Sequence, residues 1–202
     1  EKFDLAFEYM KDLERISFSA NENITVGKYS LQLEFNSTIT NDLKGFYKSQ
    51  FLDLNDNVKW IATTQFEPTS ARNAFPCWDE PEYKAVFSIA LTSDEKYLRV
   101  SNEKVLSENK LENGKVETLF VDSMKMSTYL VAFVIGELEI TEIGSVGDTK
   151  IRIIHRPGFS HQTSFAGIAG MKILEFFENY YQIPYPGSKL DLIAIPDFAM
   201  GA

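Results

Sequence analysis

The sequence is poor in the residues that bind metals and form disulfides. Only two histidines and one cysteine occur among its 202 residues. Cys77 stands alone, so no disulfide can form within the chain and the redox compartment stays open. His155 and His161 are six positions apart across Pro157 and Gly158, so they cannot share a helix face as the zinc motif H-E-x-x-H requires. We therefore expect no metal site in this chain and interpret both as ordinary loop histidines.

Clustered positive charge and long apolar runs are also lacking. The net charge is −9, and the lysines and arginines are scattered, which argues against a nucleic-acid partner. The longest apolar run, residues 129–135, is far shorter than the roughly 20 residues that a membrane-spanning helix needs. We predict no membrane-spanning segment in this chain.

Motifs that carry chemistry by themselves are missing too. There is no glycine-rich phosphate loop, no G-x-S-x-G elbow and no evident cysteine–histidine pair. We therefore predict no catalytic residue within the chain. A hydrophobic content of 44% nevertheless predicts one substantial core and room for a second, incomplete unit.

What the first two-thirds of the sequence does contain is apolar–polar alternation with a period of two, which is typical of half-buried strands. Asn113-Gly114 predicts a hairpin turn. Residues 129–135 are apolar at nearly every position, as expected of a strand in the middle of a sheet. The clearest alternating strands are predicted at residues 3–9, 29–35 and 87–91.

The pattern changes near residue 140, where we place a domain boundary. A glycine-containing hairpin leads into a strand, and apolar residues at three- and four-residue spacing then predict an amphipathic helix. Thr163 or Ser164 could cap its start and Pro184 ends it. A short strand follows. The strand, the helix and the final strand are predicted at residues 150–154, 163–182 and 190–195.

The tract from residue 61 to residue 81 predicts a rigid, crowded corner between two strands. Its prolines fix φ at several points, and Phe75 and Trp78 supply large apolar surfaces. Arg72 could form charge-assisted bonds with Asp79 and Glu80 that lock the turn. Cys77 lies between Pro76 and Trp78, where a small buried hydrophobe is a better interpretation than a reactive thiol.

Two glycosylation sequons occur on polar stretches, at Asn23 and Asn36. They favour a secreted or cell-surface origin, although three-residue matches also arise by chance. We expect both asparagines to be glycosylation sites.

The corner tract resembles the signature of the zinc-dependent aminopeptidase N family, in which T-T-Q-F-E-P-T-x-A-R leads into F-P-C-x-D-E-P. A second resemblance precedes the end of the chain, where three short segments look like the family's approach to its Gly-Ala-Met-Glu-Asn exopeptidase motif, and the chain ends with the Gly and Ala. A third lies at residues 45–49, which resemble the G-F-Y-x-S strand end of the family. The segments of the second resemblance are residues 183–186, 189–192 and 195–198.

The resemblance implies a mainly β fold. Residues 1–140 would form a saddle-like β-sandwich N-terminal domain, which we expect to lack its first strands. Residues 141–202 would form the first hairpin, helix and strand of an incomplete, thermolysin-like α+β catalytic domain.

The resemblance also implies substrate-binding residues. Gln65 matches the residue that reaches towards the free amine of the substrate, a role suited to an uncharged acceptor. Gly201 and Ala202 match residues whose backbone lies along the bound peptide, and Met200 could line the pocket for the first side chain. The plain alternatives are a strand-end amide bonded to backbone at Gln65 and a core methionine at Met200.

The implied function is that of a zinc metallo-aminopeptidase, a hydrolase that removes the N-terminal residue from peptides in peptide catabolism. Zinc would activate a water with a glutamate as general base, and its ligands would lie outside this chain. The implied partners are peptides with a free N-terminus and the remainder of the catalytic domain. We expect the chain alone to be inactive, and the parent to be a membrane ectoenzyme, with a cytoplasmic location left open.

Two other functions remain open at this point. A non-catalytic binding or receptor ectodomain could use the same fold, and an intact H-E-x-x-H in the parent would argue against it. The related leukotriene hydrolase branch fits less well, because Thr64-Gln65-Phe66 and residues 77–81 are typical of the aminopeptidase N type.

Overall fold

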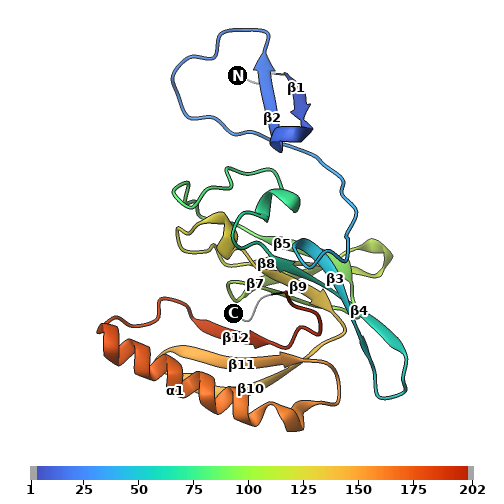
Figure 1. The fold of residues 1–202 in the computed structure, drawn as a ribbon, viewed down its shortest axis with the longest axis vertical. Coiled ribbons are helices and arrows are strands. Elements are labelled where there is room, and N and C mark those ends of the chain that lie inside the picture. The colour runs from blue at the N-terminus through green and yellow to red at the C-terminus, as the bar shows by residue number, and fades with distance from the viewer. Residues whose placement is uncertain (1–3, 200–202) are drawn as a thin grey trace. The chain divides into compact units, whose positions relative to one another are not determined.

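The computed structural model describes residues 4–199. The chain forms two compact units, Glu1–Thr38 and Ile39–Ala202, and each is considered by itself. Strands dominate both units, which confirms the mainly β fold (Figure 1).

The first unit contains one antiparallel hairpin, β1 (Leu5–Met10) with β2 (Arg15–Ala20). Leu5, Phe7 and Tyr9 lie opposite Ala20, Phe18 and Ile16, so one face of the hairpin is apolar. The alternation thus predicts the strand but not its burial, since 74% of Phe7 is exposed.

The strand predicted at residues 29–35 is wrong. This stretch has no strand assignment in the structure, and Tyr29, Leu31 and Phe35 are exposed. A strand needs a hydrogen-bonded neighbour as well as an alternating pattern, and no pairing between this stretch and another described segment is found.

The second unit is built around a four-stranded antiparallel sheet with the order β3-β4-β9-β6. Because β9 lies between two neighbours, the central strand predicted at residues 129–135 is confirmed in place, but it is shorter than expected. A 3-10 turn, Thr128–Leu130, takes up its first part. The strands are β3 (Gly45–Leu52), β4 (Val58–Gln65), β6 (Leu98–Ser101) and β9 (Phe133–Gly136).

A three-stranded antiparallel sheet with the order β5-β8-β7 lies in the same unit. Its strands are β5 (Ala90–Asp94), β7 (Val105–Lys110) and β8 (Lys115–Phe120). The predicted hairpin is confirmed, because Asn113 and Gly114 connect β7 to β8 with φ of 78° and 73°, values that these two residue types tolerate. The strand predicted at residues 87–91 is regular only from Ala90.

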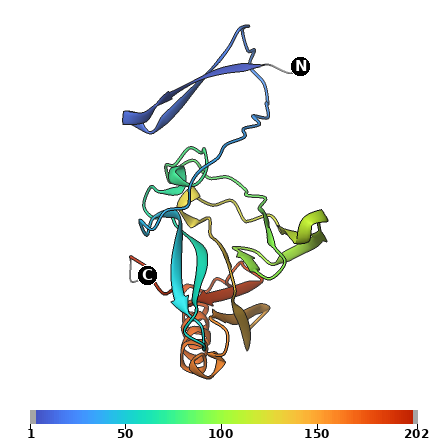
Figure 2. The ribbon, with the colours of Figure 1, turned by 90° about the vertical axis from the view of Figure 1, so that its right-hand side faces the viewer.

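The last sheet has the order β10-β11-β12. The predicted hairpin and final strand form this sheet, and the predicted helix lies between its second and third strands in sequence. It comprises β10 (Glu139–Val146), β11 (Thr149–His155) and β12 (Lys189–Ile193), with β11 and β12 parallel. The helix α1 (Ser164–Tyr181) makes the crossover between these parallel strands, as they require. It lies along one face of the sheet (Figures 1 and 2).

The ends of α1 agree with the sequence signals only in part. Thr163 occupies the N-cap position, but its hydroxyl donates to the carbonyl of Ser160 and caps no helical amide. Gln182 is left-handed at the C-cap, two residues before Pro184. The domain boundary near residue 140 stays a prediction.

Apolar packing joins the last sheet to the four-stranded sheet. Phe51, Ile61 and Val134 form a buried cluster against which Ile193 and Ile195 pack. The segment that follows β12 is therefore held against β3 and β4, which positions the candidate site.

Candidate functional site

Gln65, the predicted amine-binding residue, is the last residue of β4 and lies opposite Gly45, the first residue of β3. Its side chain is half-buried, and its amide Nε2 donates to the carbonyl of Glu67 at 3.5 Å. Because residues opposite each other in an antiparallel pair share a face, Gln65 projects to the same side as Gly45, Tyr47 and Ser49.

That side of β3 binds the segment after β12. The Tyr47 hydroxyl donates to the backbone carbonyl of Asp197 at 2.7 Å, and Ser49 Oγ donates to Asp197 Oδ2 at 2.8 Å. Ser49 Oγ also accepts from the Asp197 amide at 3.1 Å. Burial, and to a lesser extent the Asp197 charge, raise the pKa of Tyr47 to about 12, so its phenol stays a donor at neutral pH.

The contacts of this segment define the direction in which it runs. Ile195 packs on the cluster that contains Phe51, whereas Asp197 lies at Ser49 and Tyr47. The segment thus runs antiparallel to β3, towards the end of the sheet that carries Gln65. The predicted substrate-binding residues Met200, Gly201 and Ala202 lie outside the described residues.

The corner after β4 is locked by one buried carboxylate, as predicted for Arg72 and Asp79. Asp79 Oδ2 accepts from the Arg72 amide and from Arg72 Nε, each at 3.1 Å, and Asp79 Oδ1 accepts from the Thr128 hydroxyl at 2.7 Å. Charge-assisted bonds of this kind are stronger than neutral ones. The carboxylate therefore fixes the corner to the turn before β9.

The interior of the corner is apolar. Phe66 and Ala71 are buried with Met126 and Val131, and Phe75 and Cys77 pack against them. Burial, followed by the nearby Asp79 charge, raises the pKa of the Cys77 thiol to about 12. This supports the interpretation of Cys77 as an unreactive hydrophobe. Trp78, by contrast, is 74% exposed and adds no core surface within the described residues.

The corner also touches the start of β3. Gly45 has φ of +67°, and a Cβ added there would lie 2.8 Å from the Cβ of Asn73. Only glycine combines this conformation with such a close approach. Two segments of the sequence resemblance, residues 45–49 and the corner, therefore meet at Gly45.

A buried charge network, which the sequence analysis missed, lies between the sheets. Arg152 donates to both Asp191 oxygens at 2.7 Å, and Lys189 Nζ donates to Asp191 and to the carbonyl of Ser101. Burial lowers the pKa of Lys189. For Asp191 burial acts to raise the pKa, but the hydrogen bonds from Arg152 and the Lys189 charge outweigh it, and the pKa is lowered. The sequence signal was weak: one charged residue of an apolar strand, Arg152, and two of another, Lys189 and Asp191.

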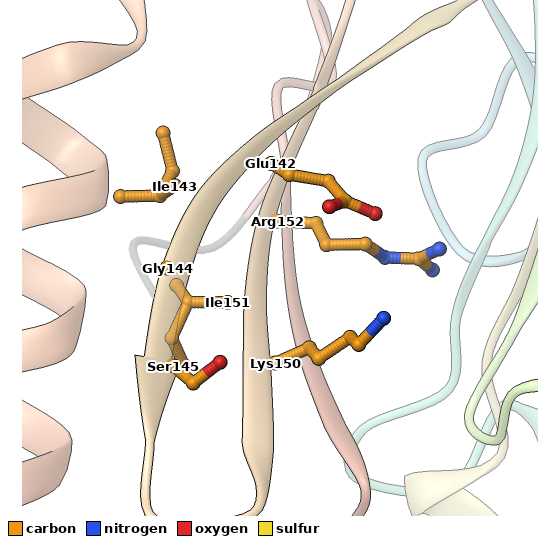
Figure 3. Close-up of a pocket in the computed structure, with 7 residues that line it drawn as sticks. All are labelled: Glu142, Ile143, Gly144, Ser145, Lys150, Ile151 and Arg152. Carbon is orange, nitrogen blue, oxygen red and sulfur yellow. The ribbon is translucent and has the colours of Figure 1, made fainter.

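A shallow hollow of about 290 Å³ lies over β10 and β11 beside this network. Figure 3 shows Glu142, Lys150 and Arg152 extending to one side of these strands and Ile143 to the other, towards α1. Arg152 is already bound by Asp191, and every residue that lines the hollow comes from β10 or β11, so the hollow is an open depression on one hairpin.

The histidines were predicted to be loop residues, and this is wrong for His155. It is buried at the end of β11, where Nδ1 and Nε2 lie 2.8 Å from the Arg156 carbonyl and 2.9 Å from the Thr141 hydroxyl. Nδ1 is the donor to the Arg156 carbonyl, whereas either Nε2 or the Thr141 hydroxyl can be the donor in the second contact. His161 lies in a 3-10 turn beside Phe159.

The described residues show neither a metal-ligand cluster nor a membrane-spanning helix. Within residues 4–199, no three or more histidine, cysteine, aspartate and glutamate side chains are grouped so as to hold a metal ion. No helix in that part of the chain is both long and apolar enough to cross a bilayer.

Comparison with known proteins decides the family. The Peptidase M1 N-terminal domain matches residues 1–130. The chain belongs to the peptidase M1 family. Similarity to M1 relatives extends beyond that domain, since one match covers 95% of the chain.

The relatives are named aminopeptidases. This M1 chain is 39% identical over 201 residues to endoplasmic reticulum aminopeptidase 2 of Homo sapiens, a match covering 95% of the chain and 21% of the relative. It is 41% identical to aminopeptidase M1-A of Oryza sativa subsp. japonica, a match that covers 90% of this chain and 20% of the relative. It is 41% identical to the puromycin-sensitive aminopeptidase of Caenorhabditis elegans, a match that covers 87% of this chain and 19% of the relative. The chain thus spans about a fifth of the length of these relatives.

The M1 family is generally zinc-dependent, but the described residues of this chain do not provide a zinc site.

Proposed function

We propose that this chain supplies substrate-binding walls of a zinc aminopeptidase that removes the N-terminal residue from peptides. The observation that carries the proposal is the attachment of Asp197 to Tyr47 and Ser49, on the face of β3 and β4 that also bears Gln65. The zinc and its ligands would belong to the remainder of the catalytic domain, outside this chain, and no step of the hydrolysis is assigned to the residues described.

The proposed roles follow from the chemistry of each side chain. The carbonyl of Gln65 would accept a hydrogen bond from the ammonium group of the substrate. Gly201 and Ala202 would place backbone along the peptide, where the lack of a side chain at Gly201 permits close approach. Met200 would form an adaptable wall for the first side chain.

The domain organisation belongs to the same proposal. Residues 1–140 would form the N-terminal β domain, and residues 141–202 would begin a thermolysin-like catalytic domain. The separate sheet β10-β11-β12, with α1 on one face, supports this division.

A location in the secretory pathway or at the cell surface is proposed as well. Asn23 and Asn36 are exposed within the first unit, and several relatives are named for the endoplasmic reticulum. A glycosidase that increases the electrophoretic mobility of the secreted protein, but not of an Asn23→Gln, Asn36→Gln variant, would support it. A cytoplasmic protein would show no shift.

Hydrolysis of aminoacyl reporters by the full-length protein tests the function. We expect cleavage that a chelator abolishes and zinc restores, and none from residues 1–202 alone. Gln65→Ala should raise KM by about 10-fold or more, since a hydrogen bond to a charged group is worth roughly 1.5–3 kcal/mol. Gln50→Ala, an exposed glutamine of β3, is the matched control and should leave KM unchanged.

The same assay distinguishes an aminopeptidase from a non-catalytic binding protein. A full-length protein that binds peptides but cleaves none, with or without zinc, would be a binding or receptor ectodomain. Cleavage by residues 1–202 alone would also refute the proposal, because it would require a catalytic centre within this chain.

A further inference from the structure

We infer that Tyr47 and Ser49 are positioning residues for substrate binding, which hold the segment of residues 195–199 and so set the place of the residues that follow. The inference rests on the proposed function. Neither residue touches substrate in this account. Both would act through Asp197.

The bonds to Asp197 restrain it at three points. Tyr47 binds its carbonyl, while Ser49 binds its carboxylate and accepts from its amide. Backbone and side chain are thus held together by residues of a single strand. The segment consequently cannot rotate about Asp197 or slide along β3 without breaking these bonds.

Burial shields the bonds from Tyr47 and Ser49 to Asp197 from competing water. Tyr47 is fully buried and Ser49 is 2% exposed with the segment in place, so bulk water does not compete for either hydroxyl while Asp197 is attached. An unsatisfied buried hydroxyl costs about 1–3 kcal/mol. A shift of the segment too small to admit water would therefore leave these hydroxyls unpaired and be disfavoured.

Distance along the chain carries the restraint to the proposed substrate residues. Three residues separate Asp197 from Gly201, and an extended chain advances at most about 3.3–3.6 Å per residue. Gln65 is fixed on the same sheet by pairing with Gly45. In this proposal the bonds from Tyr47 and Ser49 limit how far the residues after Asp197 can lie from Gln65, and a misplacement of about 1 Å in a binding geometry can cost 100-fold in rate.

The test uses the full-length protein with Ser49→Ala and Tyr47→Phe, assayed on an aminoacyl reporter. The control is Ser123→Ala. Like Ser49, buried Ser123 accepts from a backbone amide, that of Phe87, and donates to an oxygen, the carbonyl of Met124. All three variants should lose similar thermal stability. Only the β3 variants should raise KM, by about 5- to 10-fold for one lost hydrogen bond, and Ser49→Thr should restore part of the loss.

Hydrogen exchange without substrate provides a second readout. The amides of residues 197–199 should exchange faster in Ser49→Ala than in the wild type, and be unchanged in Ser123→Ala. An active wild type in which Ser49→Ala and Ser123→Ala behave alike in both KM and exchange would overturn this inference. An inactive wild type would instead refute the proposed function, and exchange would still decide whether Ser49 orders the segment.

Discussion

Asp79 receives both the backbone amide and the guanidinium of Arg72, each at 3.1 Å on the same carboxylate oxygen. Asp79 is 5% exposed, so its charge depends on these partners and on Thr128 for stabilisation. The polar contacts that brace the corner with the family signature therefore converge on one side chain.

Asp79→Asn should lower the free energy of unfolding by about 2–4 kcal/mol, because the amide cannot reproduce the charge-assisted bonds. Urea denaturation measures the change. Glu80→Gln, next to it in sequence but exposed, is the matched control and should change stability by less than about 0.5 kcal/mol. Equal effects of the two variants would contradict this account of the corner.

Gly45→Ala should destabilise the protein more than Gly114→Ala. Both glycines have positive φ, but a Cβ at Gly45 would meet Asn73 at 2.8 Å, whereas nothing lies within 4 Å at Gly114. We expect about 1–2 kcal/mol for the conformational strain at either site, with a further loss only at Gly45. Thermal melts of the two variants give the comparison, and similar losses would disprove the close approach.

Tyr47 should make stability depend on alkaline pH. Its pKa is raised from 10.0 to about 12 in the folded protein, so the unfolded chain loses this proton first and stability falls as pH rises from about 10 to 12. Between pH 9 and pH 11.5 the wild type should lose about 2 kcal/mol more than Tyr47→Phe. Denaturation of both proteins at the two pH values measures the difference. Equal losses of stability in the wild type and Tyr47→Phe would contradict a raised pKa for Tyr47.

Asp191→Asn should be among the most destabilising substitutions, at about 3–5 kcal/mol, because it leaves Lys189 and Arg152 without their buried counter-charge. Chemical denaturation measures the loss. Asp148→Asn makes the same chemical change at an exposed position and should have little effect. If Asp191→Asn left the stability unchanged, the ion pairs of Asp191 with Arg152 and Lys189 would not form in solution.

Cys77 should react slowly with iodoacetamide in the folded protein. Raising its pKa from 9.0 to about 12 reduces the thiolate fraction at pH 8 roughly a thousandfold, and the thiolate is the reactive form. Mass spectrometry of native and urea-unfolded samples compares the rates. Rapid labelling of the native protein would show that the thiol is not buried against the corner.

The sequence predicted best those elements whose signals are local. The helix spacing identified α1, and Asn113-Gly114 identified its hairpin, because both depend on residues close together in the chain. The strand at residues 29–35 failed for the opposite reason. Alternation describes a surface that could pair, and whether a partner strand lies beside Leu31 is decided by distant residues.

The candidate site was predictable in part. The Arg72–Asp79 lock followed from complementary charges in one tract, whereas the substrate role of Gln65 rests on a resemblance and stays a prediction. The contacts of Tyr47 and Ser49 with Asp197 cross about 150 positions of sequence, and no local pattern specifies such a pair. Arg152 and Asp191 likewise meet only because β11 and β12 pair in parallel with these two residues in register.

The pleat of β3 has a consequence for its tolerance of length changes. Gly45, Tyr47 and Ser49 face one way because each is two positions from the next, and their neighbours face the other. Deleting or inserting a single residue between Tyr47 and Ser49 would turn one of the two hydroxyls to the opposite side of the sheet. This strand should therefore accept changes of side chain far more readily than changes of spacing.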